Sequence, residues 1–110
     1  MSRQKVTKGS GNVFADLRLP NPADEETKMD LAVAINDAIE ARGLLQSEAA
    51  RVIGATQPQV SALANYRISG FSIGRLVDFL AALGRDVEIG HRPTRNGEPG
   101  HVSVRELQAA

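Results

Sequence analysis

Near the middle of the chain, two short amphipathic segments stand on either side of a glycine. In the first segment, Ala49, Ala50 and Ile53 recur at helical spacing and form one apolar face. Gly54 follows directly, and glycine readily takes the left-handed conformation in which many helices end. We therefore predict a helix over Gln46–Ile53 that stops at Gly54.

The second segment opens with a helix start signal, Thr56-Gln57-Pro58-Gln59. The Thr56 hydroxyl can accept a hydrogen bond from the backbone three residues on, and the Gln59 side chain can reach back to Thr56. Pro58 lies in the first turn, where a missing N–H breaks no helical hydrogen bond. These signals predict a helix over Gln57–Asn65, and the two segments together have the architecture of a helix-turn-helix.

Two further helices are predicted on either side of this pair. Asn21 can cap a helix that begins at Pro22, and acidic residues follow in its first turn, where they interact favourably with the helix dipole. Gly43 can end the helix. These signals together predict a helix over Pro22–Arg42. Ser72 can cap a fourth helix that closes at Gly84. Its apolar residues stand at i, i+3, i+4 and i+7, and they are Leu76, Phe79, Leu80 and Leu83.

These elements predict a mainly α fold, a helical bundle with a helix-turn-helix and a short C-terminal strand. The core must be aliphatic, because aromatic residues make up 4% of the chain and tryptophan is absent. The strand is expected at Val87-Glu88-Ile89, where apolar and charged residues alternate. It needs a ladder partner, either the same strand of a second protomer or the segment Val13 to Leu17 of its own chain.

The chain divides into three parts. Residues 1–12 are polar, rich in Lys, Ser and Gly, and are expected to form a disordered basic tail. Residues 13–90 hold all the predicted helices and form the domain. Residues 91–110 are rich in loop-forming Gly and Pro, and their order is left open by the sequence.

Charge is distributed unevenly along a chain with 13 basic and 13 acidic side chains. Between residues 22 and 40 there are six carboxylates and one basic residue, Lys28. Between residues 42 and 75 there are four arginines and one acidic residue, Glu48. A run of like charges can equally form a surface that is only exposed to solvent or a surface that contacts DNA. The charge distribution alone therefore favours neither interpretation. The four arginines are Arg42, Arg51, Arg67 and Arg75.

The composition argues against several other classes of protein. The chain lacks cysteine, which excludes disulfides and thiolate metal sites. No apolar run approaches the roughly 18 residues of a membrane span, and the N-terminus lacks a signal peptide's apolar stretch, so we expect a cytoplasmic protein. His91 and His101 lie in the loop-rich C-terminal part without a third ligand, so we expect no metal, no cofactor and no enzymatic activity.

The segment from Leu44 to Asn65, LLQSEAARVIGATQPQVSALAN, resembles the helix-turn-helix of the lambda-repressor and Cro-like family, often called XRE. The wider stretch from about Asn12 to Gly90 resembles one branch of that family, the HigA-like antitoxins and related small regulators. Leu45 departs from the family pattern, which has a capping Thr or Ser there, and Tyr66-Arg67 replaces a Gly-Lys pair. The positions that carry the resemblance are Gln46, Ala50, Gly54, Gln57, Val60 and Ser61.

The resemblance implies that Gln46 bonds a DNA phosphate, that Gln57, Gln59 and Ala62 face base edges, and that Arg67 and Arg51 contact the DNA backbone. The chemistry agrees, because a glutamine amide can bond both N7 and N6 of adenine, and an alanine methyl can contact that of thymine. The candidate DNA-binding residues are Gln46, Arg51, Thr56, Gln57, Pro58, Gln59, Ser61, Ala62, Asn65 and Arg67.

Two functions remain open at this point. The first is a transcriptional repressor that binds double-stranded DNA at a palindromic operator as a homodimer, its recognition helices about 34 Å apart. The second is a protein-interaction module, the antitoxin of a toxin-antitoxin pair, that neutralises a RelE- or HigB-like toxin while DNA binding is secondary. A gel shift on the gene's own promoter, and inspection of the neighbouring reading frame, would separate them.

Overall fold

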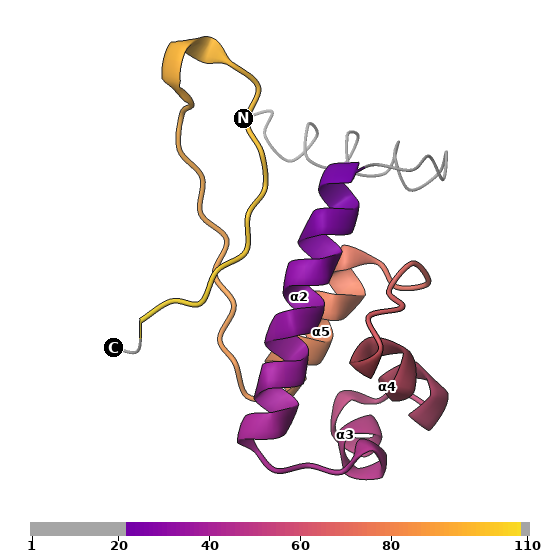
Figure 1. Cartoon of the computed structure of the whole chain (residues 1–110). Coiled ribbons are helices and arrows are strands. Elements are labelled where there is room, and N and C mark those ends of the chain that lie inside the picture. The colour runs from indigo at the N-terminus through magenta and orange to yellow at the C-terminus, as the bar shows by residue number, and fades with distance from the viewer. Residues whose placement is uncertain (1–21, 109–110) are drawn as a thin grey trace, which may run out of the picture.

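The computed structural model describes residues 22–108, which form four α-helices followed by a long extended segment (Figure 1). The expected basic tail, residues 1–12, and the segment Val13 to Leu17 lie outside the described residues. The predicted helices are confirmed, two of them ending one residue earlier than expected. The elements are α2 (Pro22–Ala41), α3 (Gln46–Ile53), α4 (Gln57–Ala64), α5 (Ile73–Ala82) and a 3₁₀ helix, η1 (Arg95–Gly97).

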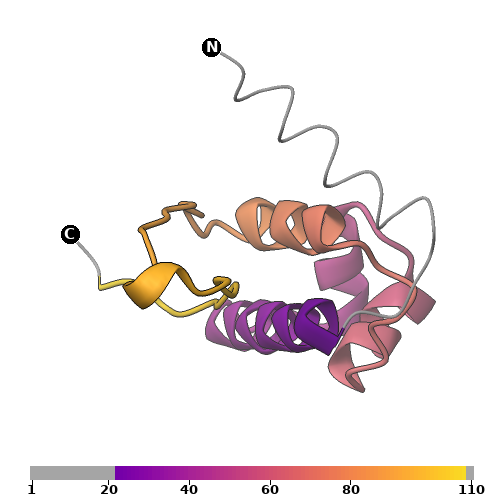
Figure 2. The same cartoon turned by 90° about the horizontal axis from the view of Figure 1, so that it is seen from above.

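The core lies where these four helices meet. α2 and α5 run alongside each other, and the shorter α3 and α4 pack against them (Figures 1 and 2). Within residues 22–108, one aromatic pair lies in this core, Phe71 and Phe79, whose ring centroids are 5.8 Å apart in an edge-to-face arrangement. The aliphatic core predicted from composition is therefore confirmed, and its members are Leu31, Ala32, Ile35, Ala38, Ala49, Ala50, Ile53, Val60, Leu63, Ile68, Phe71, Leu76, Phe79, Leu80 and Leu83.

The four helices end in similar backbone closures, each built around a residue with positive φ. Glycine fills this position after α2, α3 and α5, but Tyr66 fills it after α4, with φ 58°. Two hydrogen bonds hold Tyr66 there: its own N–H donates to Leu63 O (3.0 Å), and the Arg67 N–H donates to Ala62 O (2.8 Å). A tyrosine therefore occupies a conformation that disfavours residues with a Cβ.

The expected strand at Val87-Glu88-Ile89 is wrong for the part of the chain that the structure describes. Residues 85–108, hereafter the arm, instead form two extended stretches joined by η1 (Figure 1). No neighbouring segment within residues 22–108 supplies a ladder, and Ile89 is left 90% exposed. Alternating residues can specify an extended backbone, but a strand also needs a partner.

Candidate nucleic-acid interface

The contact between α3 and α4 is made close by small side chains and a left-handed turn. Ala49 and Ala50 are buried on the inner face of α3. Gly54 takes φ 73° and ψ 33°, and the following Ala55 N–H donates to Ala50 O at 2.9 Å. The chain thus turns over the three residues 54–56 and begins α4 against α3, as a helix-turn-helix requires.

The start of α4 is fixed by the reciprocal cap that the sequence predicts. The Gln59 N–H donates to Thr56 Oγ1 at 3.2 Å, and the Thr56 N–H donates to Gln59 Oε1 at 3.0 Å. Val60 and Leu63 are buried and hold the opposite face of the helix on the core. Gln57 and Pro58 are left exposed at the leading end of α4, the end that reads bases in helix-turn-helix proteins.

The start of α3 has only half of such a cap. Leu45 occupies the N-cap position and offers no side-chain acceptor, so only its own N–H is satisfied, by Glu48 Oε1 at 2.8 Å. Gln46 follows as the first helical residue, and its side chain is exposed. The exposed backbone donors at this helix start are available to an anion such as a phosphate.

The expected site residues differ in exposure. Gln59, Ser61 and Ala62 are half-buried, and Ala62 packs against the core, so only part of its methyl group faces outward. Asn65 donates from Nδ2 to Ser61 O at 2.9 Å, which engages the amide nitrogen within its own helix end. The exposed members of the set are Gln46, Arg51, Thr56, Gln57, Pro58, Asn65 and Arg67.

The structure brings a residue to this surface that the sequence-based set omits, Arg75 in the first turn of α5. Its Nη2 donates to Gln59 Oε1 at 3.4 Å. Its guanidinium carbon lies 5.2 Å from the centroid of the Phe79 ring and 6.0 Å from that of Phe71. The sequence counts Arg75 among the basic residues of this region, but its partner is 16 residues away, beyond the reach of a local pattern.

Charge is segregated between α2 and the rest of the helical body. α2 carries the acidic stretch, and in the described residues the only ion pair joins Lys28 Nζ to Glu25 Oε2 at 3.9 Å. No carboxylate within residues 22–108 pairs with Arg42, Arg51, Arg67 or Arg75, and all four are exposed. The surface around α3 and α4 therefore keeps its positive charge available for phosphates.

Two other kinds of site find no support in the part of the chain described. Across residues 22–108, no three His, Asp or Glu side chains gather closely enough to hold a metal ion. None of the helices there is both long and apolar enough to cross a bilayer.

The comparisons with known proteins agree with this geometry. A family model described as a helix-turn-helix domain matches residues 13–91. A solved structure described as an XRE family transcriptional regulator is 42% identical in sequence, with a TM-score of 0.75, and the match covers 80% of this chain and 100% of the other. No curated protein matches the sequence.

Proposed function

The chain belongs to the helix-turn-helix family, whose model spans most of its length, and on that premise we propose that it is a sequence-specific transcriptional repressor. The observation that carries the proposal is the exposed leading end of α4, fixed by the Thr56–Gln59 cap and flanked by arginines that pair with no carboxylate within residues 22–108. Residues 13–90 form the DNA-binding domain between two tails, and the protein works in the cytoplasm.

Gln57 is the principal base-reading residue of this proposal. Its side chain is exposed and has no hydrogen bond to any other residue among those described. The amide oxygen and nitrogen are therefore both available, and together they match N6 and N7 of adenine in the major groove. The exposed part of the Ala62 methyl group would contact a thymine methyl nearby.

Three members of the set, Gln46, Arg51 and Arg67, position the protein on the duplex. Gln46 lies at the start of α3, and Arg51 and Arg67 are exposed without carboxylate partners in the described part of the chain. Such groups contact phosphates, which supply affinity and orientation but carry no sequence information.

A gel shift on the DNA upstream of the protein's own gene tests this function. We expect a complex with the promoter fragment that survives competition by scrambled DNA of the same length and composition. The affinity should fall steeply with salt, because phosphate contacts release counterions. Equal affinity for promoter and scrambled DNA at every salt concentration would exclude sequence-specific repression.

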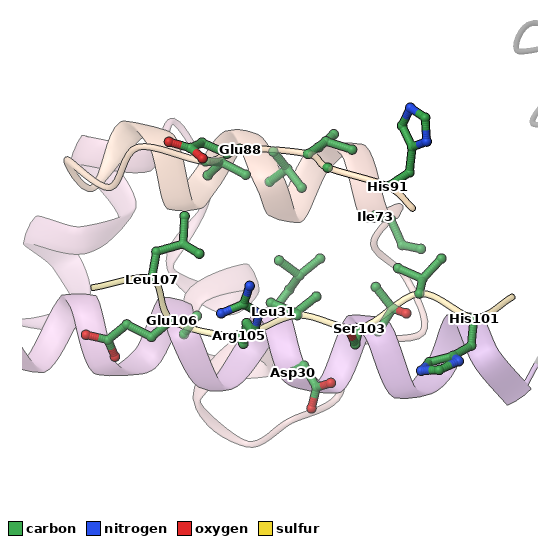
Figure 3. A pocket seen from close by; sticks show the side chains of 18 of the residues that line it. Asp30, Leu31, Ile73, Glu88, His91, His101, Ser103, Arg105, Glu106 and Leu107 are labelled. Carbon is green, nitrogen blue, oxygen red and sulfur yellow. The ribbon is translucent and has the colours of Figure 1, made fainter. Parts of the chain in front are cut away.

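The proposed repressor binds a palindromic operator as a homodimer, and the arm supports this. An open hollow of about 1890 Å³ lies between its two extended stretches and the sides of α2 and α5 that face them (Figure 3). Val104 packs against the core, but Val102 and Ile89 are exposed, and the extended backbone has no ladder partner in the described chain. The arm of a second protomer would supply that ladder and cover these side chains.

Capture of a toxin is the second candidate function, and the same exposed surface favours it. Met29 and Val33 on α2 are about two-fifths exposed, and Val33 lines the hollow beside the arm. A RelE- or HigB-like ribonuclease could cover this surface in an antitoxin of the HigA type. A small toxic ribonuclease gene beside this one, and a complex of the two products by gel filtration, would support the antitoxin role.

A further inference from the structure

The side-chain amide of Gln59 has a fixed orientation, set by two donors. The Thr56 N–H donates to Oε1 at 3.0 Å, and Arg75 Nη2 donates to the same oxygen at 3.4 Å. A backbone N–H and a guanidinium can only donate, so they must face the amide oxygen and not the nitrogen. The NH₂ group therefore points away from both, and no group within residues 22–108 accepts from it.

Arg75 is itself held in place by the core. Its guanidinium lies near the rings of Phe79 and Phe71, both buried, at 5.2 and 6.0 Å from their centroids. Its backbone N–H donates to Ser72 Oγ at 3.1 Å, which fixes the first turn of α5. Stacking on aromatic rings suits a planar guanidinium, and no carboxylate in the described chain competes for it.

We propose that Arg75 is a positioning residue that turns Gln59 into a donor-only reader and so directs it to guanine. With its oxygen engaged twice, Gln59 can offer only N–H donors to a base. Guanine presents two acceptors, N7 and O6, on its major-groove edge, whereas adenine places a donor, N6, beside its acceptor. Cytosine presents a donor alone and is the least suitable partner.

The two glutamines at the leading end of α4 therefore differ in what they read. Among the described residues, none bonds the amide oxygen or nitrogen of Gln57, which suits adenine, whereas only the NH₂ group of Gln59 is left unbonded, which suits guanine. The inference rests on the proposed function, because only a DNA-binding protein has a base for Gln59 to read.

Selection of binding sites from random DNA tests the inference, with the full-length protein and four variants compared at one salt concentration. Arg75→Leu removes the guanidinium, and Arg67→Leu removes the same charge from an exposed site without a contact to Gln59. Gln59→Glu keeps the oxygen that accepts from Thr56 and Arg75 but replaces the NH₂ group with an acceptor. Gln57→Glu makes the same change at the neighbouring position, where no cap is involved.

The wild-type protein should select guanine at one operator position by roughly tenfold over adenine, the scale of a good base contact. Arg75→Leu should lower that ratio at least fivefold, while Arg67→Leu weakens binding to every site without changing the ratio. Gln59→Glu should exchange guanine for cytosine at the same position, since a carboxylate accepts from cytosine N4. Gln57→Glu should change a different position.

The outcomes separate this inference from the function on which it rests. A wild-type motif that a folded Arg75→Leu variant leaves unchanged would overturn the role of Arg75, and one that Gln59→Glu leaves unchanged would overturn the reading role of Gln59, while repression through α4 stands in both cases. Selection of no motif by the wild-type protein would overturn the proposed function and the inference with it. Thermal melts of each variant accompany the selection, and because Gln59→Glu retains the cap, it tests the reading role of Gln59 even if Arg75→Leu unfolds.

Discussion

Asn36 in α2 donates from Nδ2 to the carbonyl oxygen of Leu63 in α4, at 3.0 Å and across 27 residues of sequence. The same oxygen accepts the Tyr66 N–H at 3.0 Å, so one carbonyl joins the end of α4 both to α2 and to its own closing turn. The Thr56–Gln59 cap fixes the other end. The orientation of the proposed reading helix is thereby set at both ends.

Replacing Asn36 should loosen this tether. We expect Asn36→Ala to lower the free energy of unfolding by about 1 kcal/mol, the usual net contribution of one hydrogen bond. Leu63 O keeps its bond from Tyr66, so the loss should not reach the cost of an orphaned carbonyl. Urea denaturation measures the change, and Asp37→Ala, at the exposed neighbour, should stay within about 0.5 kcal/mol of wild type. Equal losses in both variants would count against the tether.

Tyr66 is expected to be a site where substitution stabilises the protein. Tyr66→Gly should raise the free energy of unfolding by about 0.5 to 1 kcal/mol. The left-handed conformation costs a residue with a Cβ about 1 to 2 kcal/mol, and glycine removes that cost. Glycine also makes the unfolded chain more flexible, which offsets part of the gain. The matched control is Gly54→Ala at φ 73°, where an added Cβ meets no atom within 4 Å. That variant should lose about 1 kcal/mol from backbone strain alone. Thermal melts of both variants, moving in opposite directions, check the prediction.

Gln57→Ala should remove sequence preference at one base pair without affecting stability. The side chain makes no hydrogen bond within the described residues, and a bidentate base contact contributes about 1 to 3 kcal/mol of discrimination. Competition titrations with single-base operator variants measure it. In contrast, Gln46→Ala should weaken binding to all sequences alike, as expected of a phosphate contact. A uniform loss in Gln57→Ala would remove this residue from the reading set.

Arg67→Ala should lower the slope of log affinity against log salt by about one unit if the side chain contacts a phosphate. The side chain is exposed and forms no ion pair in the part of the chain described, so its charge is free to do so. Arg95→Ala, in η1 and far from α3 and α4 (Figure 1), should leave the slope unchanged. An unchanged slope in Arg67→Ala would show that it makes no backbone contact.

Truncation before Val87 should leave a folded helical monomer with poor operator affinity. The helices and nearly the whole core precede this point, while Val104 is the part-buried arm residue that packs on the core. Sedimentation of the full and truncated proteins, with and without operator, tests the dimer. A full-length protein that stays monomeric on DNA would refute the dimer, and a truncated protein that stays dimeric would refute only the role of the arm.

Local chemistry explains why so much of the helical frame was predictable. The Thr56–Gln59 cap, Gly54 and Ser72 act within three or four residues, and the structure has each where the sequence places it. The resemblance to XRE proteins likewise rests on one contiguous segment, and the solved XRE regulator confirms that part of it. Helix starts and stops need no knowledge of the rest of the chain, because the atoms that decide them are sequence neighbours.

What the sequence alone determined is thus the four helices, their capped ends, the aliphatic core and the helix-turn-helix. Only the tertiary structure decided that Arg75 contacts Gln59, that Asn36 bonds to Leu63, that Ala62 packs against the core and that residues 87–89 find no ladder partner among the described residues. Each of these depends on which faces pack together or on whether a partner strand exists. Packing joins atoms that are far apart along the chain, and no local pattern specifies those pairs.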